Sequence, residues 1–166
     1  PEEAYLTEIS IVRGEIRSHL RHLGRWMRPA PRPTPLKLLP AKSRIVSQPL
    51  GQALIVAPWN YPVQLLLNPL VGAISAGCTA LLKPSPYTPH VAKAIEGMMT
   101  EIFDEEYVAV VQGDRAVNTQ LFDMRWDVIF FTGSPALGRV VMAAAAKNLT
   151  PVVLELGGKS PCIVDC

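Results

Sequence analysis

Four stretches of this sequence carry side chains capable of chemistry, each just after an apolar run typical of a strand. They are Asn60 in Pro58-Trp59-Asn60-Tyr61-Pro62, Lys83 before Pro84-Ser85, the loop 132–138 with two glycines, and Glu155 before Gly157-Gly158. A carboxylate at the end of an apolar run can serve as a general base, because burial raises its pKa. A rigidly held amide can donate to an oxyanion. A lysine can reach ribose hydroxyls or a phosphate, and a glycine turn before a helix suits a phosphate.

Each stretch also has an ordinary structural explanation. A strand-end Glu turned to solvent, a lysine at a strand terminus, an Asn bonded to its own turn and a capped helix are all common. The loop 132–138 also lacks the full GxGxxG pattern of dinucleotide-binding loops. The functional interpretation gains weight if the four stretches share one parallel sheet, because ligands bind such sheets outside the carboxyl ends of their strands.

The apolar pattern predicts such a sheet. Strands are expected at 52–57, 79–83, 107–112, 127–131 and 152–156, and helices at 63–77, 89–102, 114–122 and 135–147. The strand around Glu155 is a continuous run of Val and Leu and is expected to be fully buried. This alternation predicts an α/β fold, an open parallel Rossmann-like sheet with helices on both faces.

The first part of the chain follows a different pattern. Residues 2–27 predict one long amphipathic helix, with an apolar stripe at Leu6, Ile9, Val12, Ile16, Leu20, Leu23 and Met27. Five prolines between positions 29 and 40 predict a stiff, extended connector across a surface, and 43–48 is a candidate for a separate strand. We therefore expect an N-terminal helix at 1–28, a Pro-rich linker at 29–42, and an α/β domain at 43–166 that is truncated at its C-terminal end.

The composition excludes several classes of protein. Hydrophobic residues make up 49% and charged residues 18%, as in a globular protein. A net charge of +2 is too small to indicate nucleic acid or an anionic membrane as a partner. Prolines and polar residues interrupt the uncharged segment 45–82, so we expect no membrane span. The three cysteines are widely spaced, which predicts neither a metal site nor a disulfide framework and favours the cytoplasm.

Four ordered motifs resemble the aldehyde dehydrogenase superfamily. They are Pro58-Trp59-Asn60-Tyr61-Pro62, Leu82-Lys83-Pro84-Ser85, Phe131-Thr132-Gly133-Ser134 and Leu154-Glu155-Leu156-Gly157-Gly158-Lys159. The run 141–147, followed by Leu149-Thr150-Pro151 and by Lys159-Ser160-Pro161-Cys162, resembles the class 3 branch in particular.

The resemblance implies oxidation of aldehydes to carboxylic acids with NAD or NADP, through a thiohemiacetal and a thioester on a cysteine. Asn60 would donate to the oxyanion, and Glu155 would be the general base that activates water. Lys83 would hold the adenosine ribose. The remaining cofactor-binding residues that it implies are Gly133, Ser134 and Gly138 at the pyrophosphate, together with Trp59, Ser85, Leu156 and Gly157.

Two departures from the family pattern matter. Many members carry a Glu three residues after this lysine, where Pro86 stands here, so we expect NADP to be tolerated. The family's nucleophilic cysteine lies well downstream of Glu155, and Cys78, Cys162 and Cys166 are not expected to replace it.

The chain begins at Pro1 and stops at Cys166 behind an apolar run, so we expect a fragment that is inactive by itself. It would hold the cofactor site and the general base, while the aldehyde site and homo-oligomerisation belong to the complete enzyme. The alternative is a stand-alone, non-catalytic module that binds a nucleotide or another protein.

Overall fold

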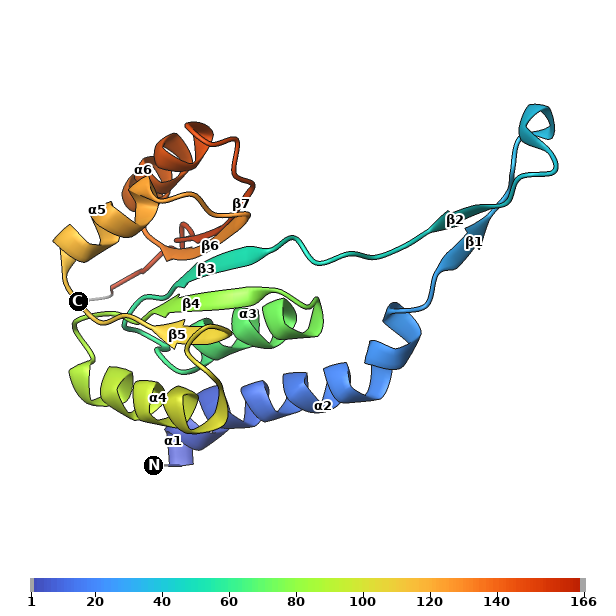
Figure 1. Ribbon diagram of the computed structural model, residues 1–166. Helices are drawn as coiled ribbons and strands as arrows, with labels where there is room; N and C mark the ends of the chain where they lie inside the picture. Colours follow the sequence, from blue (N-terminus) through green and yellow to red (C-terminus); the bar gives the residue numbers. More distant parts are fainter. Residues whose placement is uncertain (1, 165–166) are drawn as a thin grey trace.

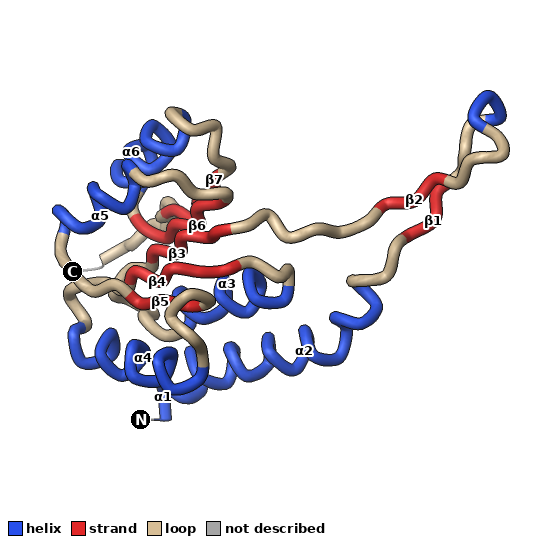
Figure 2. The backbone as a smooth tube through the Cα atoms, viewed as in Figure 1, coloured by secondary structure: helices blue, strands red, loops and turns tan. Residues whose placement is uncertain are grey.

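A five-stranded parallel sheet forms the centre of the molecule (Figures 1 and 2). The computed structural model describes residues 2–164. The strands lie in the order β5-β4-β3-β6-β7, and their bounds are β3 (Gln52–Val56), β4 (Thr79–Lys83), β5 (Val108–Val110), β6 (Val128–Gly133) and β7 (Val152–Leu156). The predicted α/β fold is confirmed, including the expected parallel sheet.

Helices cover both faces of this sheet (Figure 1). α3 (Gln64–Ser75) and α4 (Pro89–Ile102) lie on one face, and α5 (Arg115–Asp123) and α6 (Pro135–Ala146) lie on the other. The central strand β3 supplies both cores, because its side chains alternate between the faces. Ile55 and Ala57 join the core under α3 and α4, whereas Leu54 and Val56 join the core under α5 and α6. A strand covered on both faces is apolar throughout, which is why β3 reads as a continuous apolar run.

The prediction that the strand around Glu155 is fully buried is wrong. β7 is an edge strand, and α6 covers only one of its faces. Val152, Leu154 and Leu156 turn toward the core under α6. Val153 is 48% exposed, and Glu155 on the same face is exposed as well. Beyond β7, residues 157–164 are exposed and extend away from the sheet.

The N-terminal helix packs against the α/β part rather than standing apart from it. It runs as α1 (Glu2–Ala4), a π-helical segment η1 (Tyr5–Ile9) and α2 (Ser10–Trp26), which contacts α3. Of the seven residues in the predicted apolar stripe, Val12 is buried in the core under α3 and α4. Leu6 and Leu20 are 66% and 76% exposed. The N-terminal helix therefore contributes to the core of the α/β part.

The Pro-rich stretch forms an arm. β1 (Ala30–Arg32) and β2 (Ser43–Ile45) pair antiparallel, with the short 3-10 helix η2 (Leu36–Leu38) at the tip. The arm projects from the body (Figure 1), so the backbone is extended as predicted but does not cross a surface. The structure also differs from the predicted boundary at residue 43, because β2 pairs with β1 and not with the sheet. Thr34 Oγ1 closes the arm by accepting a hydrogen bond of 2.9 Å from the backbone N–H of Ser43.

Candidate cofactor site

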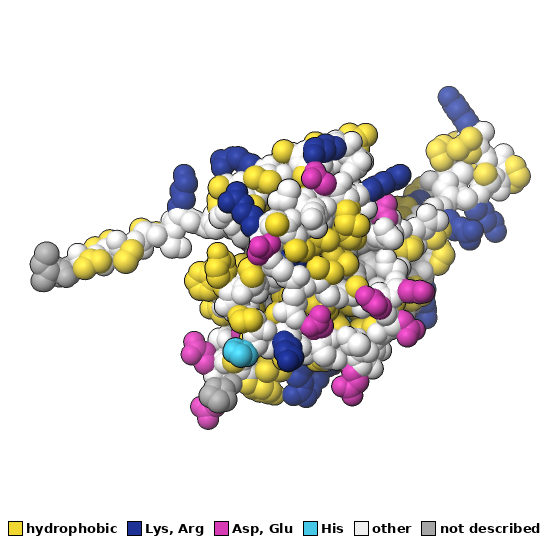
Figure 3. Space-filling view, turned by 60° about the vertical axis from the view of Figure 1, so that its left-hand side comes forward, with side chains coloured by type: hydrophobic (Ala, Val, Ile, Leu, Met, Phe, Trp, Pro, Cys, Tyr) yellow, Lys and Arg dark blue, Asp and Glu magenta, His cyan; other side chains and the backbone are white. Residues whose placement is uncertain are grey.

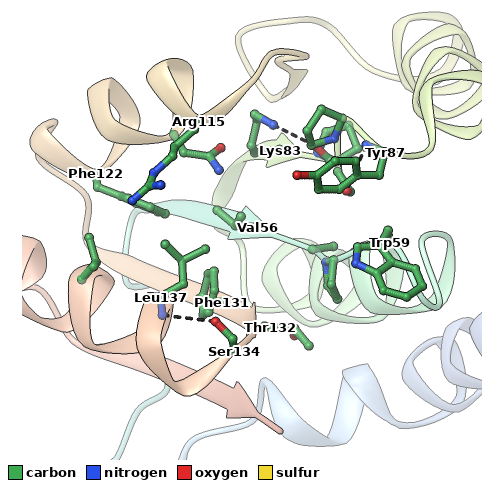
Figure 4. A pocket seen from close by; sticks show the side chains of 18 of the residues that line it. Val56, Trp59, Lys83, Tyr87, Arg115, Phe122, Phe131, Thr132, Ser134 and Leu137 are labelled. Atoms are coloured by element: carbon green, nitrogen blue, oxygen red, sulfur yellow. Dashed lines mark hydrogen bonds between the residues drawn. The ribbon is translucent and has the colours of Figure 1, made fainter.

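A cavity of about 620 Å³ opens at the carboxyl edge of the sheet (Figure 4). Figure 3 turns this edge toward the viewer and shows hydrophobic side chains gathered across its middle. β4 and β5 are added to one side of β3, whereas β6 and β7 are added to the other side, so the strand order reverses at β3. Such a reversal leaves a crevice outside the carboxyl ends of the two strands. Val56 and Ala57 from the end of β3 and Thr132 and Gly133 from β6 line the cavity.

Lys83 is the most buried ionisable group of the cavity. It ends β4, its side chain is 1% exposed, and Nζ donates a 2.8 Å hydrogen bond to the carbonyl oxygen of Pro84. An ammonium has three N–H donors, so one protein partner leaves donors for a ligand. Burial lowers the pKa of Lys83 below its usual 10.5, and the nearby carboxylate of Asp114 opposes that shift. Ser85 and Pro86 continue the lining from this strand end.

The loop after β6 supplies a helix N-terminus to the same cavity. Ser134 is the N-cap of α6, and its Oγ accepts from the backbone N–H of Leu137 at 3.3 Å. Gly133 precedes it, and a Cβ there would lie 2.6 Å from Cζ of Phe131, so no side chain fits without moving that ring. Gly133 and Ser134 both line the cavity.

Gly138 lies elsewhere. It is buried against β7, where a Cβ would come within 2.8 Å of Cδ2 of Leu156. Its small size allows α6 to pack closely on β7. Gly138, Leu156 and Gly157 are not among the residues that line the cavity.

Two polar atoms of the cavity lining have no partner within residues 2–164. They are Oδ1 of Asn118 on α5 and Oγ1 of Thr132 at the end of β6, both buried. Buried polar atoms normally carry a hydrogen bond, so these two atoms are available to bond a ligand or a water. Asn118 was missed from the sequence, together with Arg115 on the same helix. Their position after β5, the remaining strand of the sheet, was the available signal, but neither residue stands in a recognisable motif.

The turn before α3 carries Trp59 and Asn60. Trp59 is 61% exposed and lines one end of the cavity, and Asn60 is exposed next to it. The turn is held from outside by Glu8 on the N-terminal helix. Glu8 Oε2 accepts from the backbone N–H groups of Val63 at 2.8 Å and Gln64 at 3.2 Å. A buried carboxylate therefore fixes the start of α3, which has no side-chain cap of its own.

Glu155 lies outside the cavity. It pairs in register with Thr132 of β6, on the face of β7 that no described helix covers. The structure therefore brings Lys83, Ser85, Gly133, Ser134 and Trp59 to one cavity, while Asn60 and Glu155 stand beside it. Of the cysteines, Cys78 is buried in the core, Cys162 is exposed, and Cys166 is outside the described residues.

Residues 2–164 contain neither a candidate membrane span nor a candidate metal site. No helix in that range is long and apolar enough to cross a membrane. No group of three or more His, Cys, Asp or Glu side chains gathers there in a way that could hold a metal ion.

Comparison with known proteins places these features in a family. Residues 8–166 match the model of the aldehyde dehydrogenase family. Aldehyde dehydrogenase family 3 member H1 of Arabidopsis thaliana is 46% identical over 98% of this chain and 34% of its own length. A structure described as the substrate-bound state of Staphylococcus aureus AldH matches with a TM-score of 0.93 and 46% identity, over 96% of this chain and 35% of that one.

A second solved structure carries a cofactor. The Mycobacterium tuberculosis aldehyde dehydrogenase complexed with NAD+ matches with a TM-score of 0.83 and 31% identity, over 96% of this chain and 33% of that one. The chain thus spans about a third of the length of the relatives that it matches.

Proposed function

Because this chain belongs to the aldehyde dehydrogenase family, we propose that it forms the nicotinamide-cofactor site of an enzyme that oxidises aldehydes to carboxylic acids. The observation that carries the proposal is the cavity at the carboxyl edge of the sheet, with the buried Lys83 in its wall. The NAD+ complex of the Mycobacterium tuberculosis relative supports a dinucleotide as the ligand.

The residues present fit such a cofactor. The spare N–H donors of Lys83 suit the adenosine ribose hydroxyls, and the unpartnered atoms of Asn118 and Thr132 offer further hydrogen bonds. Gly133 lines the cavity next to the N-terminus of α6, where the helix dipole favours an anion such as a pyrophosphate. When bound, the cofactor would accept a hydride from the substrate.

The side chains beside the cavity would serve the chemistry. Asn60, in the turn fixed through Glu8, would donate from its amide to the oxygen of the aldehyde as that oxygen becomes negative. Glu155 would take a proton from the water that attacks the carbonyl carbon of the thioester, and the thiolate would leave as the acid forms. The nucleophilic cysteine would come from a part of the complete protein outside this chain, since Cys78 is buried in the core.

The test uses the full-length protein, an aldehyde and NAD or NADP, with formation of the reduced cofactor followed at 340 nm. Lys83→Met should weaken cofactor binding about tenfold or more, because a buried ammonium makes charge-assisted hydrogen bonds. Lys93→Met is the matched control, because Lys93 is exposed on α4 and does not line the cavity.

Glu155→Gln separates the two chemical steps. The first turnover should keep its burst of reduced cofactor, while steady turnover falls about 100-fold or more, since general-base catalysis contributes at least that much. A complete protein that neither binds a nicotinamide cofactor nor reduces one with any aldehyde would overturn the proposal.

A further inference from the structure

A residue far away in the sequence holds the first turn of α3. Val63 stands at the N-cap of α3, and its apolar side chain accepts no hydrogen bond. Glu8 Oε2 instead accepts from the backbone N–H groups of Val63 and Gln64. A Ser, Thr, Asp or Asn at the N-cap is the usual local solution, whereas a buried carboxylate is costly to desolvate. The need to cap α3 therefore does not by itself explain why a carboxylate from another helix is used.

The backbone around Glu8 is irregular. Glu8 lies in η1, the π-helical segment that stands between α1 and α2, and η1 contacts α3. π-helical turns are rare within α-helices and are found frequently at functional sites. Here the irregular turn lies where the N-terminal helix meets the start of α3, so it places the carboxylate against that start.

The first turn of α3 is continuous with the turn that carries Asn60. Only two residues separate Asn60 from Val63. The carbonyl oxygen of Tyr61 accepts a 3.0 Å hydrogen bond from the backbone N–H of Leu65, which ties the turn to the helix. Asn60 is exposed, so the backbone of this turn, and not side-chain packing, sets where its amide points. A shift of the first turn of α3 would therefore move that amide.

We propose that Glu8 is a positioning residue for catalysis, because it fixes the direction in which Asn60 presents its amide to the aldehyde oxygen. The inference rests on the proposed function, in which Asn60 donates to that oxygen as it becomes negative. An oxyanion donor works only where it is aimed at the developing charge, and a displacement of about 1 Å can cost about 100-fold in rate. Glu8 does not line the cofactor cavity, so it acts on the reaction through Asn60 and not on cofactor binding.

The test measures the first turnover of the full-length protein, as the burst of reduced cofactor at 340 nm with saturating aldehyde and saturating NAD or NADP. It is run at a temperature at which circular dichroism shows every variant to be folded. Glu8→Ala should slow the burst about tenfold or more, as expected when a donor is misplaced, and the affinity for the cofactor should stay the same. Glu8→Gln keeps an oxygen acceptor and should retain more of the burst rate than Glu8→Ala.

A double-mutant cycle shows whether the effect passes through Asn60. Asn60→Ala alone should slow the burst about 100-fold, which is the cost of losing one oxyanion donor. In the Asn60→Ala background, Glu8→Ala should have no further effect on the burst rate, because the group that Glu8 positions is absent. Val12→Ala is the matched control, because it removes buried methyl groups from the same N-terminal helix without touching the N–H groups of α3. It should keep the wild-type burst rate.

An unchanged burst rate in Glu8→Ala would overturn the inference, as would an equal slowing by Val12→Ala, which would assign the effect to loss of stability. A Glu8→Ala change that slows the Asn60→Ala protein as much as it slows the wild type would also overturn it, since Glu8 would then act by another route. In each of these cases the wild-type protein still reduces its cofactor with an aldehyde, so the proposed function stands. A wild-type protein that reduces neither NAD nor NADP with any aldehyde would overturn both.

Discussion

The carboxylate of Glu8 ties the N-terminal helix to the start of α3, and removing it should destabilise the fold measurably. Glu8 is 9% exposed, and its Oε2 accepts from two backbone N–H groups, at 2.8 Å from Val63 and 3.2 Å from Gln64. These N–H groups belong to the first turn of α3, which leaves its donors without partners inside the helix. The carboxylate also faces the positive end of the α3 dipole.

The contacts of Glu8 set the size of the expected change in the free energy of unfolding. Loss of a helix cap costs about 0.5–2 kcal/mol, and a hydrogen bond to a charged group contributes about 1.5–3 kcal/mol. The two N–H groups share one oxygen and stand in half-buried residues that water can partly reach. We therefore expect Glu8→Ala to lower the free energy of unfolding by about 2 kcal/mol. Glu8→Gln keeps an oxygen acceptor without the charge and should lose about half as much.

Thermal and urea unfolding of the full-length protein, followed by circular dichroism, measure the effect. Glu3→Ala is the control, because Glu3 lies on the same N-terminal helix and is exposed. A Glu8→Ala protein whose unfolding free energy stays within about 0.5 kcal/mol of the wild type would show that water replaces the carboxylate. An equal loss in Glu3→Ala would assign the effect to the helix charge and not to the cap.

Two more predictions concern the cavity and the packing behind it. The pKa of Lys83 is lowered in the folded state, so between that value and 10.5 the unfolded chain binds more protons, and stability without cofactor should rise with pH across this window. Thermal unfolding from pH 7 to 10.5 should show this rise in the wild type and not in Lys83→Met. Gly138→Ala should cost about 1 kcal/mol or less, because its methyl group would press only on the flexible end of the Leu156 side chain and alanine favours a helix over glycine. In the Leu156→Ala background, where there is room for the methyl group, Gly138→Ala should cost less than it does in the wild type. Gly97→Ala, where nothing lies within 4 Å of the new Cβ, should be neutral or slightly stabilising in the same urea titration.

The sequence predicted the strands and helices of the α/β part well, because the apolar periodicity of each segment matches the burial of that segment in the fold. The strands at 79–83 and 152–156 and the helix at 89–102 have the predicted bounds. In the last case, Pro89 stands at the first helical position, where proline is favoured. The apolar pattern failed for the strand around Glu155, since a run of Val and Leu does not reveal that only one face of an edge strand is covered. The apolar stripe of the N-terminal helix failed for the same reason, because a stripe does not reveal how much of it is covered. Of its seven residues, all within the described part of the chain, Val12 is the one buried in the core.

The candidate site was predictable where a motif marks it. Lys83 and Ser134 stand in recognisable stretches and lie in the cavity. Arg115 and Asn118 occupy an ordinary amphipathic helix. They reach the cavity because α5 packs into the core on one face of the sheet, where Leu121 and Phe122 join Leu54 and Val56 of β3. The contact of Glu8 with Val63 joins residues 55 positions apart, and no local pattern signals it.

The division of the core into two clusters has a consequence for how the chain folds during synthesis. The buried residues under α3 and α4 run from Val12 to Val108, so all of them are synthesised before β6, which adds only the partly buried Phe130 to that core. Leu54 and Val56 on the other face of β3 stay uncovered until Ile129, Phe131 and Val141 have been synthesised. Until those residues arrive, the nascent chain presents the apolar back of its own central strand, which is a surface that chaperones recognise and that promotes aggregation.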